Sequence, residues 1–114
     1  MSLERLPSHL EVAGILRGAE AAGGFATVLR KGDPDRGSLM MVLTSRGQHS
    51  TILERILGLD GSYAWQRVGP AESAGSIEID NFLAKRARFD EDSWIIELDI
   101  ADPERFIAET TSLG

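Results

Sequence analysis

Apolar positions near the N-terminus repeat with helical spacing. They fall at i, i+3, i+4 and i+7, the spacing that places side chains on one face of a helix. Ser8 and Glu11 match the S-x-x-E capping box that begins a helix, and the Gly23-Gly24 pair is a left-handed stop signal. We therefore predict a helix over residues 8–22, with a buried stripe of Val12, Ile15, Leu16 and Ala19.

Four short β-type runs follow, separated by the turn signals GDPDRG, SRGQ and LDGS. The second run is apolar on both alternating faces, which suits a central strand covered on both sides. Asp60-Gly61 is the strongest hairpin signal, because both central positions of a type I′ turn need positive φ. We expect a four-stranded antiparallel meander over residues 25–31, 38–45, 49–57 and 62–68.

The rest of the chain predicts one more strand between two helices. The small, polar segment 69–76 indicates a flexible internal connection. A helical stripe then predicts a helix over about 77–89. The alternating segment WIIELDI predicts a half-buried strand over 94–100, whose pairing direction stays open. Asp102-Pro103 is typical of an N-cap followed by proline at the first helical position, and opens a short last helix.

These elements indicate an α+β fold in the order α-ββββ-α-β-α, with helices packed on the sheet. A chain of 114 residues fits one globular domain, residues 1–114. The net charge of −6 disfavours binding to phosphate backbones, and hence nucleic acid. The absence of cysteine excludes disulfides, thiolate nucleophiles and zinc-thiolate sites, and suits a cytoplasmic protein. No apolar run approaches the length of a membrane span, so we expect no membrane partner.

The GDPDRG segment combines two aspartates with flanking basic residues. Asp33, Pro34 and Asp35 match the first three positions of a type I turn, and Gly37 can take the left-handed position that closes a short hairpin loop. The alternative is a cation or ligand site. Hard cations take six or more oxygen ligands, however, and two exposed aspartates supply too few. We interpret the segment as a turn and keep Asp33 as a contact candidate.

Two other residue sets carry candidate chemistry. Glu97 and Asp99 project from one face of a predicted strand, where they could act as an acid–base pair. Pairing with basic residues of the preceding helix, Lys85, Arg86 and Arg88, explains them more simply.

The second set is a row on the fourth predicted strand, Tyr63, Trp65 and Arg67. Such a row can cover a sheet face, and it is our best prediction for a contact surface because aromatic residues and arginine are enriched at interfaces.

No catalytic, metal or cofactor motif is recognisable. His9 and His49 are the only histidines, and a two-histidine metal site would need a further ligand. Neither a P-loop, a G-x-G-x-x-G motif nor a G-x-S-x-G elbow occurs. We therefore assign no catalytic residue, metal or cofactor, and favour a non-enzymatic protein.

Two segments together, LRGAEAAGGFATVLRKGDPDRG (16–37) and FDEDSWIIELDI (89–100), resemble a family of short bacterial proteins that form a domain of unknown function. The resemblance extends from about Leu6 to Ile107, although family members usually have a small residue where Arg36 stands. It implies a bacterial, cytoplasmic, single-domain protein. The family has no assigned activity or site residue, so none is transferred.

Two functional hypotheses follow. The first is a small interaction or regulatory module that could form a homodimer or bind a protein partner, since an exposed strand edge must be protected or used. The second is a binding protein or minor enzyme for an anionic metabolite. Its pocket would lie between the N-terminal helix and the sheet, with arginines such as Arg30 or Arg67 gripping the anion.

Overall fold

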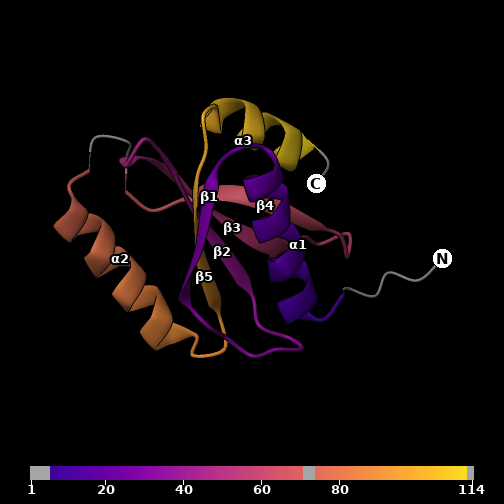
Figure 1. Cartoon of the computed structure of the whole chain (residues 1–114). Coiled ribbons are helices and arrows are strands. Elements are labelled where there is room, and N and C mark those ends of the chain that lie inside the picture. The colour runs from indigo at the N-terminus through magenta and orange to yellow at the C-terminus, as the bar shows by residue number, and fades with distance from the viewer. Residues whose placement is uncertain (1–5, 71–73, 113–114) are drawn as a thin grey trace.

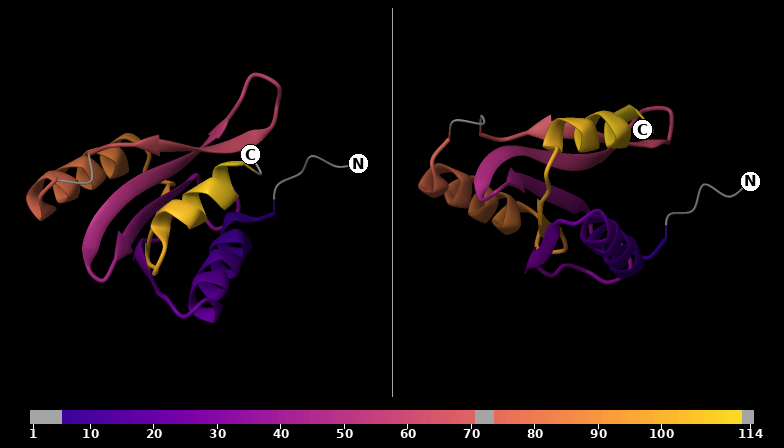
Figure 2. Two further views of the ribbon diagram at one scale, coloured as in Figure 1. Left: turned by 90° about the horizontal axis from the view of Figure 1, so that it is seen from above. Right: turned by 45° about the horizontal axis from the view of Figure 1, so that its top comes forward.

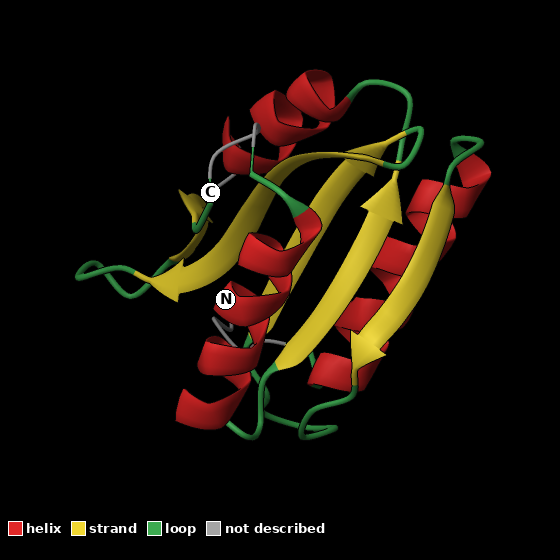
Figure 3. Ribbon diagram, turned by 90° about the vertical axis from the view of Figure 1, so that its left-hand side faces the viewer, coloured by secondary structure: helices red, strands yellow, loops and turns green. Residues whose placement is uncertain are grey.

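The computed structural model, which describes residues 6–70 and 74–112, has three helices packed on the two faces of a twisted five-stranded sheet (Figures 1 and 3). The predicted α+β class and element order are confirmed. The centre of the predicted flexible connection, residues 71–73, lies outside the described residues. The elements are α1 (Ser8–Ala21), β1 (Phe25–Arg30), β2 (Leu39–Ser45), β3 (Gln48–Leu57), β4 (Tyr63–Val68), α2 (Ser76–Phe89), β5 (Trp94–Asp99) and α3 (Pro103–Ser112).

The strand order is β1-β5-β2-β3-β4, so the predicted four-stranded meander is wrong at its first strand. Only β2, β3 and β4 form an antiparallel meander. β5 inserts between β1 and β2, antiparallel to β1 and parallel to β2. The reason is burial: Trp94, Ile95 and Ile96 are all buried and need cover on both faces, whereas most of β1 is exposed and suits an edge.

Each face of the sheet carries its own apolar core. On one face, α1 and α3 cover buried side chains of the central strands, among them Leu43, Leu53 and Ile96. On the other face, α2 covers a smaller cluster of Met40, Val42, Ile52 and Ile95. Figure 1 shows this division, with α2 on one side of the sheet and α1 and α3 on the other. The β3–β4 hairpin extends beyond the helices (Figure 2).

The type I′ signature belongs to a different hairpin from the one predicted. Arg46 (φ 53°) and Gly47 (φ 78°) form the tight turn between β2 and β3. Among the described residues, Arg46 is the only non-glycine with positive φ, so Asp60 does not adopt the expected conformation. Asp60 instead uses its carboxylate to accept the Ser62 N–H and hydroxyl, within a longer loop.

The GDPDRG segment does not close a hairpin, because it connects β1 to the non-adjacent strand β2. The predicted turn is present: the Asp33 carboxylate accepts the backbone N–H groups of Asp35 (2.9 Å) and Arg36 (2.8 Å). Gly37 is not left-handed, contrary to expectation. It is buried, and a Cβ there would lie 2.2 Å from the Asp92 carbonyl oxygen, so close approach explains this glycine.

The same segment begins α1, and the predicted capping box is wrong. The N-cap residue is Pro7, whose side chain forms no capping hydrogen bond, and Ser8 lies inside the first turn, where its hydroxyl donates to the Gly37 carbonyl at 2.7 Å. The first helical N–H groups, of Ser8 and His9, donate to the Asp35 and Pro34 carbonyls at 3.2 and 2.9 Å. The 32–37 segment therefore satisfies the helix start that Ser8 and Glu11 were expected to cap.

Candidate functional site

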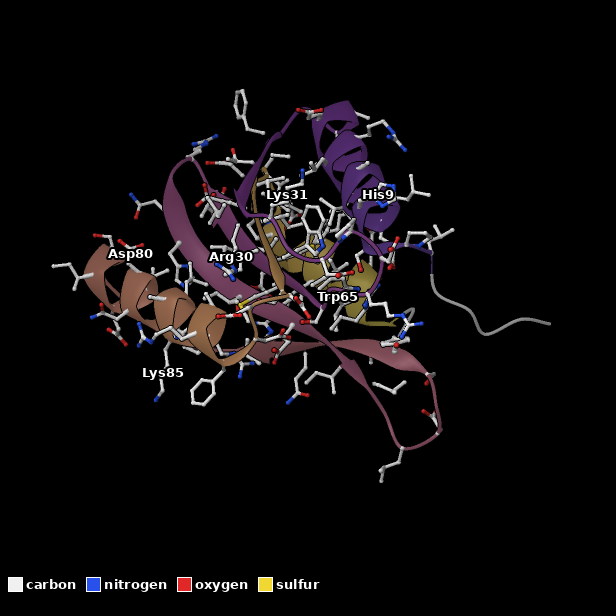
Figure 4. All side chains as sticks on the ribbon, turned by 90° about the horizontal axis from the view of Figure 1, so that it is seen from below. His9, Arg30, Lys31, Trp65, Asp80 and Lys85 are labelled. Atoms are coloured by element: carbon white, nitrogen blue, oxygen red, sulfur yellow. The ribbon has the colours of Figure 1, made fainter. Side chains whose placement is uncertain are left out.

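Arg30 and Asp33 lie at the end of β1 and in the segment that follows it. Arg30, labelled with Lys31 in Figure 4, donates from Nη2 to the Glu91 carbonyl at 2.9 Å, while its buried Nε has no hydrogen-bond partner. The Asp33 carboxylate is occupied by its own loop. The hydrogen bonds from the backbone N–H groups of Arg36, which has the larger effect, and Asp35 lower the pKa of Asp33. Both residues therefore hold the segment in place around the start of β5.

The row of Tyr63, Trp65 and Arg67 lies at the opposite edge of the sheet, on the α1–α3 side. Trp65, labelled in Figure 4, packs against the larger core. Arg67 donates to Glu104 of α3 at 2.9 Å. The structure thus brings this row together on one face but separates it from Arg30 and Asp33, because β1 and β4 form opposite edges.

Sequence reasoning missed the charged pair beneath the aromatic row. Arg55 of β3 forms a bidentate ion pair with Glu11 of α1, and its guanidinium lies 5.1 Å from the Tyr63 ring centroid and 5.8 Å from that of Trp65. Only 9% of the Arg55 side chain and 16% of the Glu11 side chain are exposed. The sequence feature that could have indicated this pair is Arg55, because it faces the tyrosine and tryptophan of the neighbouring strand.

The side chains of Glu97 and Asp99 have different surroundings in the structure. Arg86 of α2 pairs with Glu54, so this arginine does not neutralise the acidic face of β5 as expected. Asp99 accepts the Arg46 and Gly47 N–H groups at 2.9 and 2.8 Å and supports the strained turn. The hydrogen bonds from Gly47, which has the larger effect, and Arg46 lower the pKa of Asp99.

Replacing Asp99 by asparagine should destabilise the protein in a pH-dependent way. A carboxyl with a lowered folded pKa stabilises the fold above its unfolded pKa, here near 3.8, and this contribution is lost as pH falls through the folded value. We expect Asp99→Asn to lower the free energy of unfolding by about 1 kcal/mol at neutral pH. The difference should shrink in urea titrations below about pH 4. Asp92→Asn removes the same charge at an exposed position and is the control. If this variant lost as much stability, and the loss did not depend on pH, the specific role of Asp99 would be contradicted.

Two cavities lie at the helix–sheet boundaries, and neither Arg30 nor Arg67 lines them. A cavity of about 410 Å³ lies between α1 and α3, lined by residues such as Ala22, Asp102 and Phe106. A second, of about 300 Å³, lies between the start of α2 and the β2–β3 hairpin. Core side chains, including Val12 and Ala19, pack between α1 and the sheet, where the arginine-lined pocket was expected.

No group of three His, Cys, Asp or Glu side chains within the described residues is arranged to hold a metal ion. No helix in that part of the chain combines the length and hydrophobicity of a membrane span.

The β1 edge is an exposed strand edge that carries large apolar side chains. β1 pairs only with β5, and its outer side has no strand partner among the described residues. Phe25, Val28 and Leu29 are 76%, 39% and 47% exposed, so half of this six-residue strand presents large apolar side chains to solvent. A bulge between Val28 and Arg30 turns Leu29 out of the regular pairing with β5. We call Phe25–Leu29 the β1 edge surface.

Comparisons with known proteins identify the family. A DUF1491 protein from Caulobacter crescentus CB15 solved by crystallography aligns with a TM-score of 0.75 and 28% identity, over 83% of this chain and 88% of that one. An NMR structure of a DUF1491 protein from the same organism gives 0.74 and 30%, over 89% and 91%.

The solution structure of protein Atu0922 from A. tumefaciens aligns with a TM-score of 0.66 and 24% identity, over 84% of this chain and 86% of that one, and supports the fold. No curated protein matches the chain. The family model described as "Protein of unknown function (DUF1491)" matches residues 6–108. The chain therefore belongs to the DUF1491 family.

Proposed function

We propose that this protein is a non-enzymatic interaction module that associates with a second copy of itself through the β1 edge surface. The observation that carries the proposal is the combination of an unpaired strand edge with exposed Phe25, Val28 and Leu29. Natural sheets protect such edges with charges, bulges or covering elements, or use them to add a strand. The only charged residue of β1 is Arg30, at its end, with Lys31 directly after the strand.

The charge distribution along β1 favours a second copy in antiparallel orientation. The strand contains no acidic residue, and its one basic residue, Arg30, is its last and is followed directly by Lys31. A parallel partner would place the two basic ends together. A twofold axis instead brings the basic end of one strand next to the uncharged Phe25 end of the other, where a cation and an aromatic ring attract each other.

The opposite edge is less suited to pairing. In β4 no large apolar side chain is exposed among the described residues, and α3 lies against this strand with an ion pair between Glu104 and Arg67. The bulge at Leu29 limits the regular β1 edge to a few residues. Because so short an edge buries a small area, we expect a weak dimer whose population depends on concentration.

The proposal also places the protein in the bacterial cytoplasm. The chain lacks cysteine, as suits a reducing compartment, and the family members compared above come from bacteria.

Sedimentation equilibrium over a wide concentration range tests the proposed dimer. We expect the wild-type protein to pass from monomer to dimer, and the double variant Phe25→Lys/Leu29→Lys to remain monomeric, because four like charges would then meet across the axis. Both side chains are exposed, so the variant should retain its far-UV circular dichroism and melting temperature.

Leu59→Lys is the matched control, since Leu59 is fully exposed at the tip of the β3–β4 hairpin, outside the β1 edge surface. This variant should associate like the wild type. A wild-type protein that stays monomeric at millimolar concentration would refute self-association. Equal loss of association in the Leu59 variant would show that the effect is not specific to β1, and would contradict the β1 edge surface as the contact.

A further inference from the structure

A polar cavity of about 300 Å³ lies between the N-terminal end of α2 and the β2–β3 end of the sheet. This volume is at the lower limit of typical small-molecule sites. Val42 and Ile79 provide an apolar part of the wall. The polar side chains that line it are Thr44, Gln48, His49, Ser76, Asp80 and Glu97.

Glu97 is an unusual residue for its position. It lies on β5, next to the middle of the sheet, with Thr27 and Val42 as its neighbours across the two adjacent strands. Its side chain is half-buried, yet within the described residues it forms neither a hydrogen bond nor an ion pair. A carboxylate held partly away from water without a partner is costly. A cation that reaches Glu97 would remove this cost.

His49 adds a second unsatisfied group to the same cavity. It follows the β2–β3 turn, beside a bulge at which the register shifts between Leu43 and Thr44. Both of its ring nitrogens are buried, and neither has a hydrogen-bond partner. A neutral imidazole has one nitrogen that accepts a hydrogen bond. A small adjustment of the ring would let that nitrogen accept from a donor in the cavity.

We infer that this cavity binds a small organic cation, an ammonium group on a short aliphatic chain. Its N–H groups would donate to Glu97 and His49, charge-assisted bonds stronger than neutral ones. Asp80, labelled near the start of α2 in Figure 4, adds a second negative charge from the opposite wall. The chain would lie against Val42 and Ile79. No lysine or arginine lines the cavity, which disfavours an anion, and the described residues offer no three-ligand metal site.

Titration of the ¹⁵N-labelled protein with 1,4-diaminobutane tests this inference by NMR. We expect saturable chemical-shift changes at Thr44, Gly47, His49 and Ile79. 1,4-Butanediol, which has the same length and no charge, should cause none. Glu97→Gln preserves the shape of the side chain and should weaken binding about tenfold or more. Glu20→Gln removes the same charge from the exposed face of α1 and should bind as the wild type does.

Three results would overturn the inference. Shifts of equal size with calcium chloride at matched ionic strength would show general screening of an acidic protein. Equal binding by the Glu97→Gln and wild-type proteins would remove the proposed anchor. Absence of saturable shifts would exclude the ligand class. None of these outcomes bears on self-association through β1, so the two proposals are tested separately.

Discussion

Replacing Gly37 with alanine should destabilise the protein by about 3 kcal/mol or more, enough to unfold a domain of marginal stability. A Cβ at this buried position would lie 2.2 Å from the Asp92 carbonyl oxygen, 2.7 Å from Cδ1 of Trp94 and 2.9 Å from the Asp33 carbonyl oxygen. Two of these atoms belong to the backbone, so no side-chain rotation relieves the overlap.

The loss of stability should be large because Gly37 lies within a network of hydrogen bonds. Its carbonyl accepts the Ser8 hydroxyl at 2.7 Å, and its N–H donates to the Asp33 carbonyl at 3.2 Å. That same carbonyl of Asp33 accepts the Trp94 indole N–H at 2.7 Å. Moving Gly37 to admit a methyl group would therefore disturb the start of α1 and the start of β5 together.

Urea unfolding of Gly37→Ala and Gly14→Ala measures the prediction against a matched control. Gly14 lies inside α1, and a Cβ there meets no atom within 4 Å. Alanine at this position should stabilise the protein by about 0.5–1 kcal/mol, the usual gain in a helix interior. Similar stabilities of the two variants would show that the segment around Gly37 adapts, and would contradict the close approach.

The secondary structure was largely predictable because local patterns determine it. Each correct prediction depends on residues a few positions apart in the sequence. Examples are the apolar stripe in α1, the alternating pattern in β5 and the Asp102-Pro103 helix start. Asp102 does accept the Arg105 N–H at 3.1 Å, as an N-cap should. The order of the strands could not be predicted, because the choice between β1 and β5 as the neighbour of β2 depends on long-range burial.

The candidate site was less predictable, for a similar reason. Tyr63, Trp65 and Arg67 share a face, as their spacing requires, but the spacing cannot show that α3 lies over that face. Asp99 and Glu97 look equivalent in sequence, yet one supports a turn whose residues are about 50 positions away, and the other faces a cavity. Contacts between segments distant in sequence decide which polar groups are satisfied.

Removing Glu11 should be the most damaging single change among the charged residues. Glu11→Ala leaves the guanidinium of Arg55 nearly buried and without its carboxylate, and removing one partner of a buried pair costs about 3–5 kcal/mol. The Tyr63 and Trp65 rings beside Arg55 offset only part of this cost, since each such contact contributes about 0.5–2 kcal/mol. We expect chemical denaturation of Glu11→Ala to show a loss of about 3 kcal/mol.

The double variant Glu11→Leu/Arg55→Met tests whether the loss comes from the unpaired charge of Arg55 or from disrupted packing between α1 and β3. Two apolar side chains of similar size should recover most of the stability, because a buried ion pair adds little over well-packed hydrophobic residues. Glu104→Ala is the control, since its pair with Arg67 is more than half exposed and should contribute about 0.5 kcal/mol or less. If the double variant were as unstable as Glu11→Ala, the loss would come from disrupted packing between α1 and β3. Recovery in the double variant would instead show that desolvation of the unpaired Arg55 charge causes the loss.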